Sequence, residues 1–121
     1  MKRLFALRGA VQCENSEADI CLRITQMYDE LLSKNNLEEK DIVSVIFSIT
    51  SDLNAVNPAS ALRKNGRALE LSLFSTLEPD CKNSLERTIR VIVHCYLNED
   101  AVLNHVYING AEVLRPDRAR K

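Results

Sequence analysis

The stretch LERTIRVIVHCY, residues 85–96, is the longest β-like run of the chain and decides how the rest of the sequence is interpreted. Side chains alternate between the two faces of a strand. One face of this run is therefore apolar: Ile89, Val91, Val93 and Cys95. Arg90 lies on the other face with Thr88, Ile92 and His94. A charge in the middle of a buried strand needs a reason.

Two further arginines stand at strand-like positions. Arg8 follows an apolar run and precedes Gly9, and we expect the first strand to cover residues 3–8. Arg115 follows Val113-Leu114 near the C-terminus. The guanidinium is a planar fork of donors that matches carboxylates and phosphates, so several arginines on strands predict a pocket for a small anion. The alternative for any one of them is an amphipathic strand whose arginine reaches solvent.

Helix-like and strand-like segments follow one another along the rest of the chain. Ser16 is placed to cap a long helix that ends near residues 34–36, and Pro58 opens a short helix that Asn65-Gly66 stops. A β-branched run predicts a strand over 42–50, and alternation predicts strands over 69–74 and 106–108. We expect one more helix over 98–104 and a tight turn at Asn109-Gly110.

These elements predict an α/β or α+β domain with a mixed sheet of about five strands and two to three helices. The order of strand, helix and strand favours a parallel crossover between the first two strands. Residues 1–117 read as a single domain, and residues 118–121 as a flexible basic tail.

Composition excludes several classes of function. A net charge of -1 gives no pull toward nucleic acid or an anionic membrane, and no apolar run reaches the length of a membrane span or a signal peptide. We therefore expect a cytoplasmic protein with neither partner. The four cysteines show no C-x-x-C spacing, so we expect free thiols that are buried or half-buried, and no metal or other cofactor. His94 and Cys95 point to opposite faces of a strand and cannot form a catalytic pair.

Several short motifs occur in one order along almost the whole chain: Arg8-Gly9-Ala10, Asp52-Leu53-Asn54-Ala55-Val56, Pro58-Ala59, Glu78, Ile89-Arg90-Val91, His105-Val106-Tyr107 and Val113-Leu114-Arg115-Pro116-Asp117. No single piece is specific. Together they resemble the monofunctional chorismate mutases of the trimeric bacterial type. The resemblance implies a pseudo-barrel homotrimer whose clefts, at the subunit boundaries, hold the active sites.

The resemblance also implies a reaction, the pericyclic (Claisen) rearrangement of chorismate to prephenate in aromatic amino-acid biosynthesis by the shikimate pathway. The ether bond breaks ahead of carbon–carbon bond formation, so negative charge grows on the ether oxygen and positive charge on the ring. No proton moves and no covalent intermediate forms. Such an isomerase works by holding the folded conformer and by placing fixed charges where charge develops.

By the same resemblance, Arg90 donates to the ether oxygen, Glu78 accepts the substrate hydroxyl, and Arg8 binds a carboxylate together with Tyr107. The substrate-binding residues implied are Arg63, Ser75, Phe74, Asn57, Ala59, Ser60, Leu114 and Arg115. Arg8, Arg90 and Tyr107 are expected on one subunit. Asn57, Ser75 and Glu78 are expected on its neighbour.

Three positions depart from the family pattern. Asn57 stands where an aromatic residue usually covers the ring, Ser60 where a lysine often lies, and Ser75 where a cysteine hydrogen-bonds. Asn57 and Ser60 support an alternative function, a non-catalytic trimeric protein that binds small carboxylates and has kept the cleft. Glu78 opposes it, because a carboxylate sensor needs no acid beside the ring. Taken without the resemblance, Tyr107 is also an ordinary core residue and Glu78 a helix-start acid.

Overall fold

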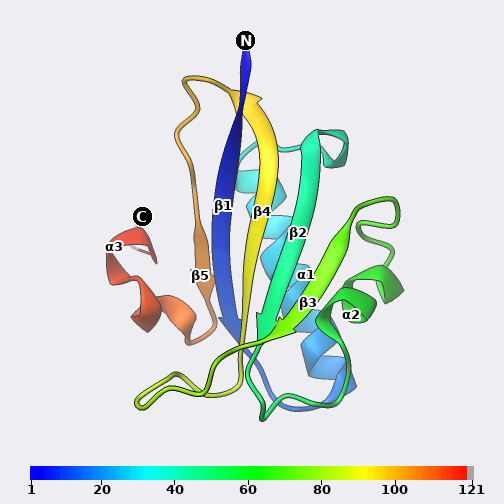
Figure 1. The fold of residues 1–121 in the computed structure, drawn as a ribbon, viewed down its shortest axis with the longest axis vertical. Coiled ribbons are helices and arrows are strands. Elements are labelled where there is room, and N and C mark those ends of the chain that lie inside the picture. Colours follow the sequence, from blue (N-terminus) through cyan, green and yellow to red (C-terminus); the bar gives the residue numbers. More distant parts are fainter. Residues whose placement is uncertain (120–121) are drawn as a thin grey trace.

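The computed structural model describes residues 1–119, with side chains for residues 1–117. Five strands form one mixed sheet in the order β3-β2-β4-β1-β5. Their bounds are β1 (Lys2–Gln12), β2 (Ile42–Ile49), β3 (Leu73–Leu77), β4 (Thr88–Asn98) and β5 (Val106–Ile108). The central β4 is antiparallel to β1 and β2, whereas β3 is parallel to β2 and β5 parallel to β1. The predicted mixed sheet is confirmed; β1 and β2 run parallel with β4 between them (Figure 1).

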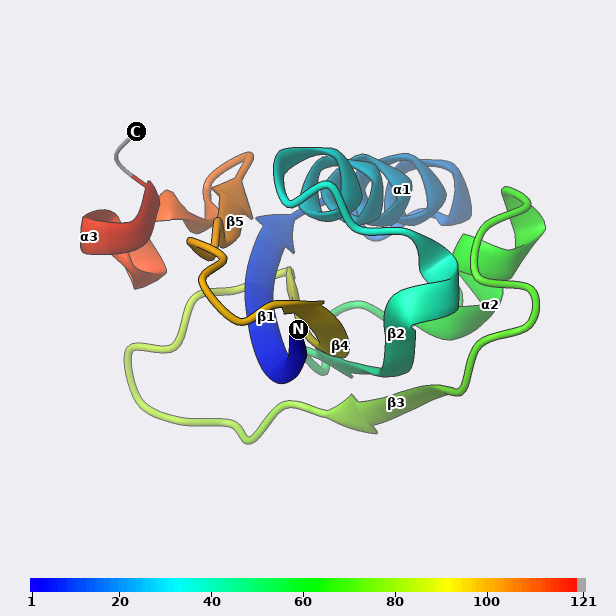
Figure 2. The same cartoon turned by 90° about the horizontal axis from the view of Figure 1, so that it is seen from above.

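Helix α1 (Glu17–Lys34) lies along one side of the sheet, and α2 (Pro58–Lys64) lies beside it near β2 and β3 (Figure 2). Both begin as the sequence predicts. The Ser16 hydroxyl accepts the Asp19 N–H at 3.1 Å, and the Asn57 side chain accepts the Ala59 N–H at 2.9 Å. Three shorter helices are η1 (Glu39–Asp41), η2 (Ala111–Leu114) and α3 (Pro116–Ala119), of which the η helices are 3₁₀.

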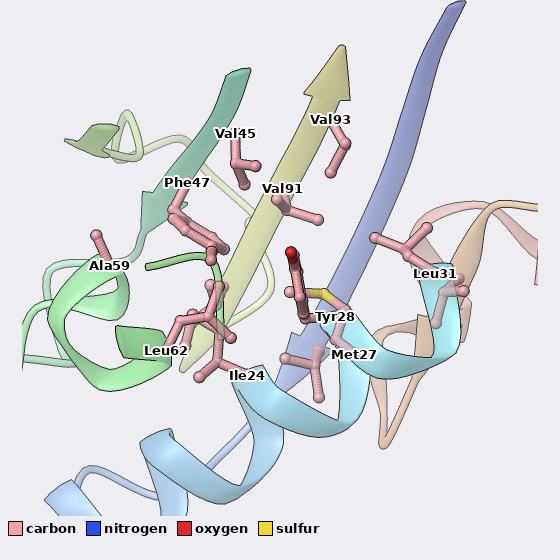
Figure 3. Close-up of a cluster of buried hydrophobic side chains, with 14 of the residues drawn as sticks. Ile24, Met27, Tyr28, Leu31, Val45, Phe47, Ala59, Leu62, Val91 and Val93 are labelled. Carbon is pink, nitrogen blue, oxygen red and sulfur yellow. The ribbon is translucent and has the colours of Figure 1, made fainter. Parts of the chain in front are cut away.

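The main core fills the space between the sheet and the helices α1 and α2 (Figure 3). It is built from residues three or four apart on α1 and from alternate residues on the strands: Ile20, Ile24, Met27, Leu31, Val45, Phe47, Val91 and Val93. Fully burying each large apolar side chain contributes roughly 1.5–3 kcal/mol. This packing explains why one face of every long strand is apolar.

The opposite side of the sheet, called here the open face, is not covered by α1 or α2 (Figure 2). Its apolar side chains remain accessible: Leu4, Phe74 and Tyr96 are exposed, and Ile46 and Ile92 are half-buried. Arg8, Ser44, Ser48, Arg90 and His94 alternate with the core residues and so lie on this face. The predicted placement of Arg90 opposite the apolar face of its strand is confirmed.

The first strand does not end at Arg8. It continues through Gly9 to Gln12. Gly9 lies where β1 packs closely against β5 and α1, because a Cβ there would come within 3.0 Å of the Val106 carbonyl and 3.3 Å of the Met27 sulfur. Glycine therefore permits close packing here and does not break the strand.

Two other expectations were wrong. The third strand begins at Leu73 and not at Leu69, because Ala68 turns the chain at a φ of 57° and donates its N–H to Glu39. Residues 98–104 form no helix. The Asn104 N–H donates to the side chain of Asn35, whose amide donates to the Asn104 carbonyl, and these bonds hold the segment against the end of α1.

The Asn109-Gly110 turn is present, with both residues at positive φ, and leads into η2. The expected tail overlaps the end of α3, whose backbone is described to Ala119. The side chains of residues 118–119, and residues 120–121 altogether, lie outside the described residues.

Candidate active site

One row of residues crosses the open face from edge to edge. Arg90 is paired in register with Ser48 on β2 and with Ala10 on β1. Ala10 is paired in turn with Tyr107 on β5, and Ser48 with Thr76 on β3. A single rung of the sheet therefore brings together residues from five separate parts of the sequence.

Glu78 binds Arg90 within the same chain. The Arg90 Nη1 donates to Glu78 Oε2 at 3.0 Å, and the Ser48 hydroxyl donates to Glu78 Oε1. The Glu78 backbone N–H donates to the Ile49 carbonyl at 2.9 Å, which fixes the residue at the end of β3. The Glu78 side chain is 19% exposed and that of Arg90 39%, so the pair is accessible to a ligand of small size.

A cavity of about 300 Å³ surrounds this pair. Its wall includes the charged residues Arg8, Arg90 and Glu78 and apolar residues such as Ile46 and Leu77. Arg8 is opposite Ile92 in register, so Arg8 and Arg90 are diagonal neighbours on adjacent strands. The Arg8 N–H also donates to His105 Nδ1 at 3.0 Å, which ties β1 to the residue before β5. Two guanidinium groups beside one carboxylate suit a ligand with carboxylates and a hydroxyl.

Tyr107 lies at the β5 end of the same row of residues, is 5% exposed, and is not among the residues that line this cavity. It packs against Ala10 and Ala111, with Leu85 and Leu114 covering them. Its hydroxyl is buried and has no hydrogen-bond partner among residues 1–117. A smaller cavity of about 80 Å³ is lined by Glu78, Arg90, Leu85 and Leu114. A buried phenol without a partner is unusual, and this hydroxyl could bind a ligand oxygen only after it becomes accessible.

Two other predicted substrate-binding residues, Asn57 and Ser75, form a second group on the face of β3 that is turned toward the helices. Ser75 is opposite Phe47 in register and so faces the helices, and its hydroxyl donates to Asn57 Oδ1 at 2.9 Å. Both line a separate cavity of about 310 Å³. On α2, Ala59 is buried, Ser60 half-buried and Arg63 exposed. Phe74, opposite Ile46, is exposed on the open face.

Leu114 ends η2 and Arg115 lies between η2 and α3, so Arg115 is not at the expected strand position. Leu114 lines the small cavity. Arg115 donates from Nε and Nη2 to the two oxygens of Asp117, at 3.1 and 2.8 Å. This hydrogen bonding raises the pKa of the Arg115 guanidinium above its usual value. Arg115 is thus held in place by Asp117.

One predicted assignment needs correction. Glu78 was expected opposite Arg90 across a subunit boundary, with Asn57 and Ser75, but it contacts Arg90 in its own chain. The reason is the direction of β3, which runs parallel to β2 and delivers residue 78 to the rung of Ile49 beside β4. Sequence reasoning also missed Ser48. The signal was available, because Ser44 and Ser48 are the polar members of an otherwise apolar strand.

All four cysteines are free thiols, as predicted, but Cys81 is exposed, contrary to the expectation that all would be buried or half-buried. His94 Nδ1 is hydrogen-bonded to the Ser44 hydroxyl at 3.1 Å on the open face, whereas Cys95 is buried on the other, as predicted. Burial raises the pKa of the Cys13 and Cys95 thiols to about 11, so both are protonated near neutral pH. Within the described part of the chain, no group of three His, Cys, Asp or Glu side chains could hold a metal ion. Among the helices described, none is long and apolar enough to cross a membrane.

Comparisons with known proteins agree on one family. A family model described as chorismate mutase type I matches residues 4–118. Chorismate mutase AroH of Bacillus subtilis (strain 168) is 32% identical over 114 residues, covering 92% of this chain and 89% of the relative. Chorismate mutase AroH of Thermus thermophilus is 32% identical over 115 residues, covering 92% and 93%. A solved chorismate mutase from Clostridium thermocellum superposes with a TM-score of 0.81 at 40% identity, covering 90% of this chain and 98% of that one.

Proposed function

The chain belongs to the chorismate mutase type I family, and from this premise we propose that the cavity around Arg8, Glu78 and Arg90 is where it isomerises chorismate to prephenate. The enzyme is an isomerase, and its family implies a place in aromatic amino-acid biosynthesis. The observation that carries the assignment of the site is the Arg90–Glu78 pair, two opposite charges held 3.0 Å apart in a half-open cavity.

Arg90 is the main electrostatic catalyst in this proposal. Its fork has five N–H donors, and one bond to Glu78 leaves others for the ether oxygen, where negative charge grows during bond breaking. A contact that strengthens only as this charge develops lowers the barrier, whereas a contact made equally to the substrate does not. Arg90 is held on the central strand, so little reorganisation is needed at the moment of reaction.

Arg8 and Tyr107 bind and orient the substrate. The Arg8 guanidinium matches a carboxylate, and the Tyr107 hydroxyl, which lacks a partner among the described residues, donates to the same group. Glu78 retains free acceptor positions and accepts the ring hydroxyl while facing the positive charge that develops on the ring. No residue is needed as a base or nucleophile, because neither proton transfer nor a covalent intermediate occurs.

The alternative of a non-catalytic carboxylate-binding protein loses one of its supports. Asn57 caps α2 and accepts the Ser75 hydroxyl, so it has a structural role that explains why an amide stands at this position. An exposed aromatic, Phe74, is available on the adjacent strand. The absence of an aromatic at position 57 therefore does not imply a lost activity.

We propose further that the site is completed by a second subunit of a homotrimer. Within one chain, Asn57 and Ser75 line a different cavity from the one around Arg8 and Arg90, and Arg63 lines neither of them. The open face also carries accessible apolar side chains, which favours its burial against another copy. In a cyclic trimer the same head-to-tail contact would form three equivalent sites. The cytoplasmic location and the lack of nucleic-acid or membrane partners stay predictions.

A direct assay tests the function. Purified protein is mixed with chorismate, whose disappearance is followed by ultraviolet absorbance, and the product is converted by acid to phenylpyruvate to identify prephenate. Turnover that Arg90→Ala abolishes supports the proposal. Binding of chorismate without turnover would support the carboxylate-binding alternative instead. Native mass spectrometry of the same sample gives the oligomeric state, and a monomer or dimer at assay concentration would contradict the shared site.

A further inference from the structure

Ser48 contacts the same carboxylate as Arg90 but through its other oxygen. Its hydroxyl donates to Glu78 Oε1, while Arg90 Nη1 donates to Glu78 Oε2 at 3.0 Å. Ser48 lies on β2 directly opposite Arg90 in register, and it lines the cavity with both of them. The three side chains thus form a short chain of hydrogen bonds anchored on β2, β4 and the end of β3.

The geometry of the Arg90–Glu78 pair is what makes this contact informative. Arginine and carboxylate side chains tend to pair through two parallel hydrogen bonds, as Arg115 and Asp117 do elsewhere in this chain. Arg90 and Glu78 share a single bond. The other oxygen of Glu78 accepts the Ser48 hydroxyl instead, so the orientation of the carboxylate is set by both partners and not by Arg90 alone.

From this arrangement we propose that Ser48 is a positioning residue for catalysis, which keeps Glu78 bound to Arg90 through one oxygen only. The remaining donors of the Arg90 fork then stay available for the substrate. Each carboxylate oxygen has two acceptor positions, so Glu78 can hold both partners and still accept the substrate hydroxyl. Without the Ser48 hydroxyl, Glu78 turns to a two-bonded pair with Arg90 and withdraws donors from the ether oxygen.

This inference rests on the proposed roles of Arg90 and Glu78, but it predicts a distinct kinetic pattern. Ser48→Ala should lower kcat about tenfold, as expected for the loss of a hydrogen bond to a charged group, and leave KM within about twofold. Ser48→Thr keeps the hydroxyl and should retain at least about a third of the parent kcat. The matched control is Ser44→Ala, which removes a hydroxyl from the same face of β2 but from the partner of His94.

A double-mutant cycle separates the role of Ser48 from that of Glu78. If Ser48 acts through Glu78, then Ser48→Ala should cost less than about twofold in kcat when it is added to Glu78→Ala. An equal tenfold loss in both backgrounds would overturn the inference, because Ser48 would then act independently of Glu78. An unchanged kcat in Ser48→Ala would also overturn the inference about Ser48, but it would leave the proposed function intact. An unaffected Glu78→Ala variant, or a parent protein without turnover, would contradict the proposed function itself, and the Ser48 inference with it.

Discussion

The two faces of the sheet are built by different rules. On the face that α1 and α2 cover, most alternate residues of the long strands are apolar and buried, and packing against the helices accounts for them. On the open face, charged, hydroxyl and exposed apolar side chains share the same strands. Burial within the chain therefore specifies the residues of the covered face. The residues of the open face are specified by what the chain binds, which in our proposal is a substrate and other copies of itself.

The largest effect tests the covered face. Phe47→Ala removes a fully buried ring on β2 and should lower the free energy of unfolding by about 3–5 kcal/mol. Leu22→Ala, on the exposed side of α1, is the control and should change it by less than about 0.5 kcal/mol. Urea unfolding measures both. Similar losses at the two positions would mean that the covered face does not carry the core.

The next effect tests the open face. Arg90→Ala should lower kcat by about 10²–10³, the loss typical of one donor to a developing oxyanion. Arg90→Lys should rescue little, because lysine keeps the charge but loses the fork. Arg3→Ala, at the exposed start of β1, is the control and should leave kcat unchanged. A kcat within about threefold of the parent in Arg90→Ala would refute the role given to this arginine.

Mixing two poorly active variants tests whether a complete active site on the open face requires residues from a second chain. Arg90→Ala and Arg63→Glu should each be poorly active, since each spoils one side of a shared site. Mixed in equal amounts, they should restore intact sites at about a quarter of the boundaries by random assortment. The matched control pairs Arg90→Ala with Glu78→Ala. Both changes fall on the same side of every site, because the two residues contact each other within one chain.

In that control mixture we expect no more activity than the sum of the separate variants. Native mass spectrometry confirms that subunits exchange. Restoration by the control mixture, or none by the first mixture after exchange, would overturn the division of the site.

A smaller effect concerns a titrating group on the covered face. Burial raises the pKa of the Cys95 thiol from 9.0 to about 11, so the unfolded chain releases this proton at lower pH than the folded one. Stability from this group is intact below pH 9 and is lost as pH rises toward 11. At pH 10 the loss is about 1.4 kcal/mol. Between pH 8 and 10, the free energy of unfolding should therefore fall by about 1.4 kcal/mol less in Cys95→Ala than in the parent protein. An equal fall in the two proteins would contradict this account.

The smallest effect is expected on the open face. Because the arginines stay charged and no proton moves in the reaction, kcat should be nearly flat between about pH 6 and 9. A pH–rate series measures this. A limb near neutrality that disappears in His94→Ala or His105→Ala would bring a histidine into the mechanism and end the purely electrostatic account.

The elements with strong local signals could be predicted from the sequence. Ser16 and the apolar residues of the first long helix specified α1, Pro58 and Asn65-Gly66 bounded α2, and β-branched runs specified β2 and β4. Residues 98–104 could not be predicted, because reciprocal Asn35–Asn104 hydrogen bonds join residues far apart in the chain. Residues 69–72 were misassigned for the same reason, since Glu39 binds the turn at Ala68.

By itself, the sequence determined which residues share a face of each strand, since a period of two fixes this locally, and its ordered motifs indicated the family. It also singled out Arg8, Glu78, Arg90 and Tyr107 as the candidate site. Only the tertiary structure decided that Glu78 joins Arg90 in its own chain, that Ser48 holds it there, and that Asn57 and Ser75 lie beyond β3. These facts depend on strand order and register. Both are set by hydrogen bonds and packing between segments that no local pattern connects.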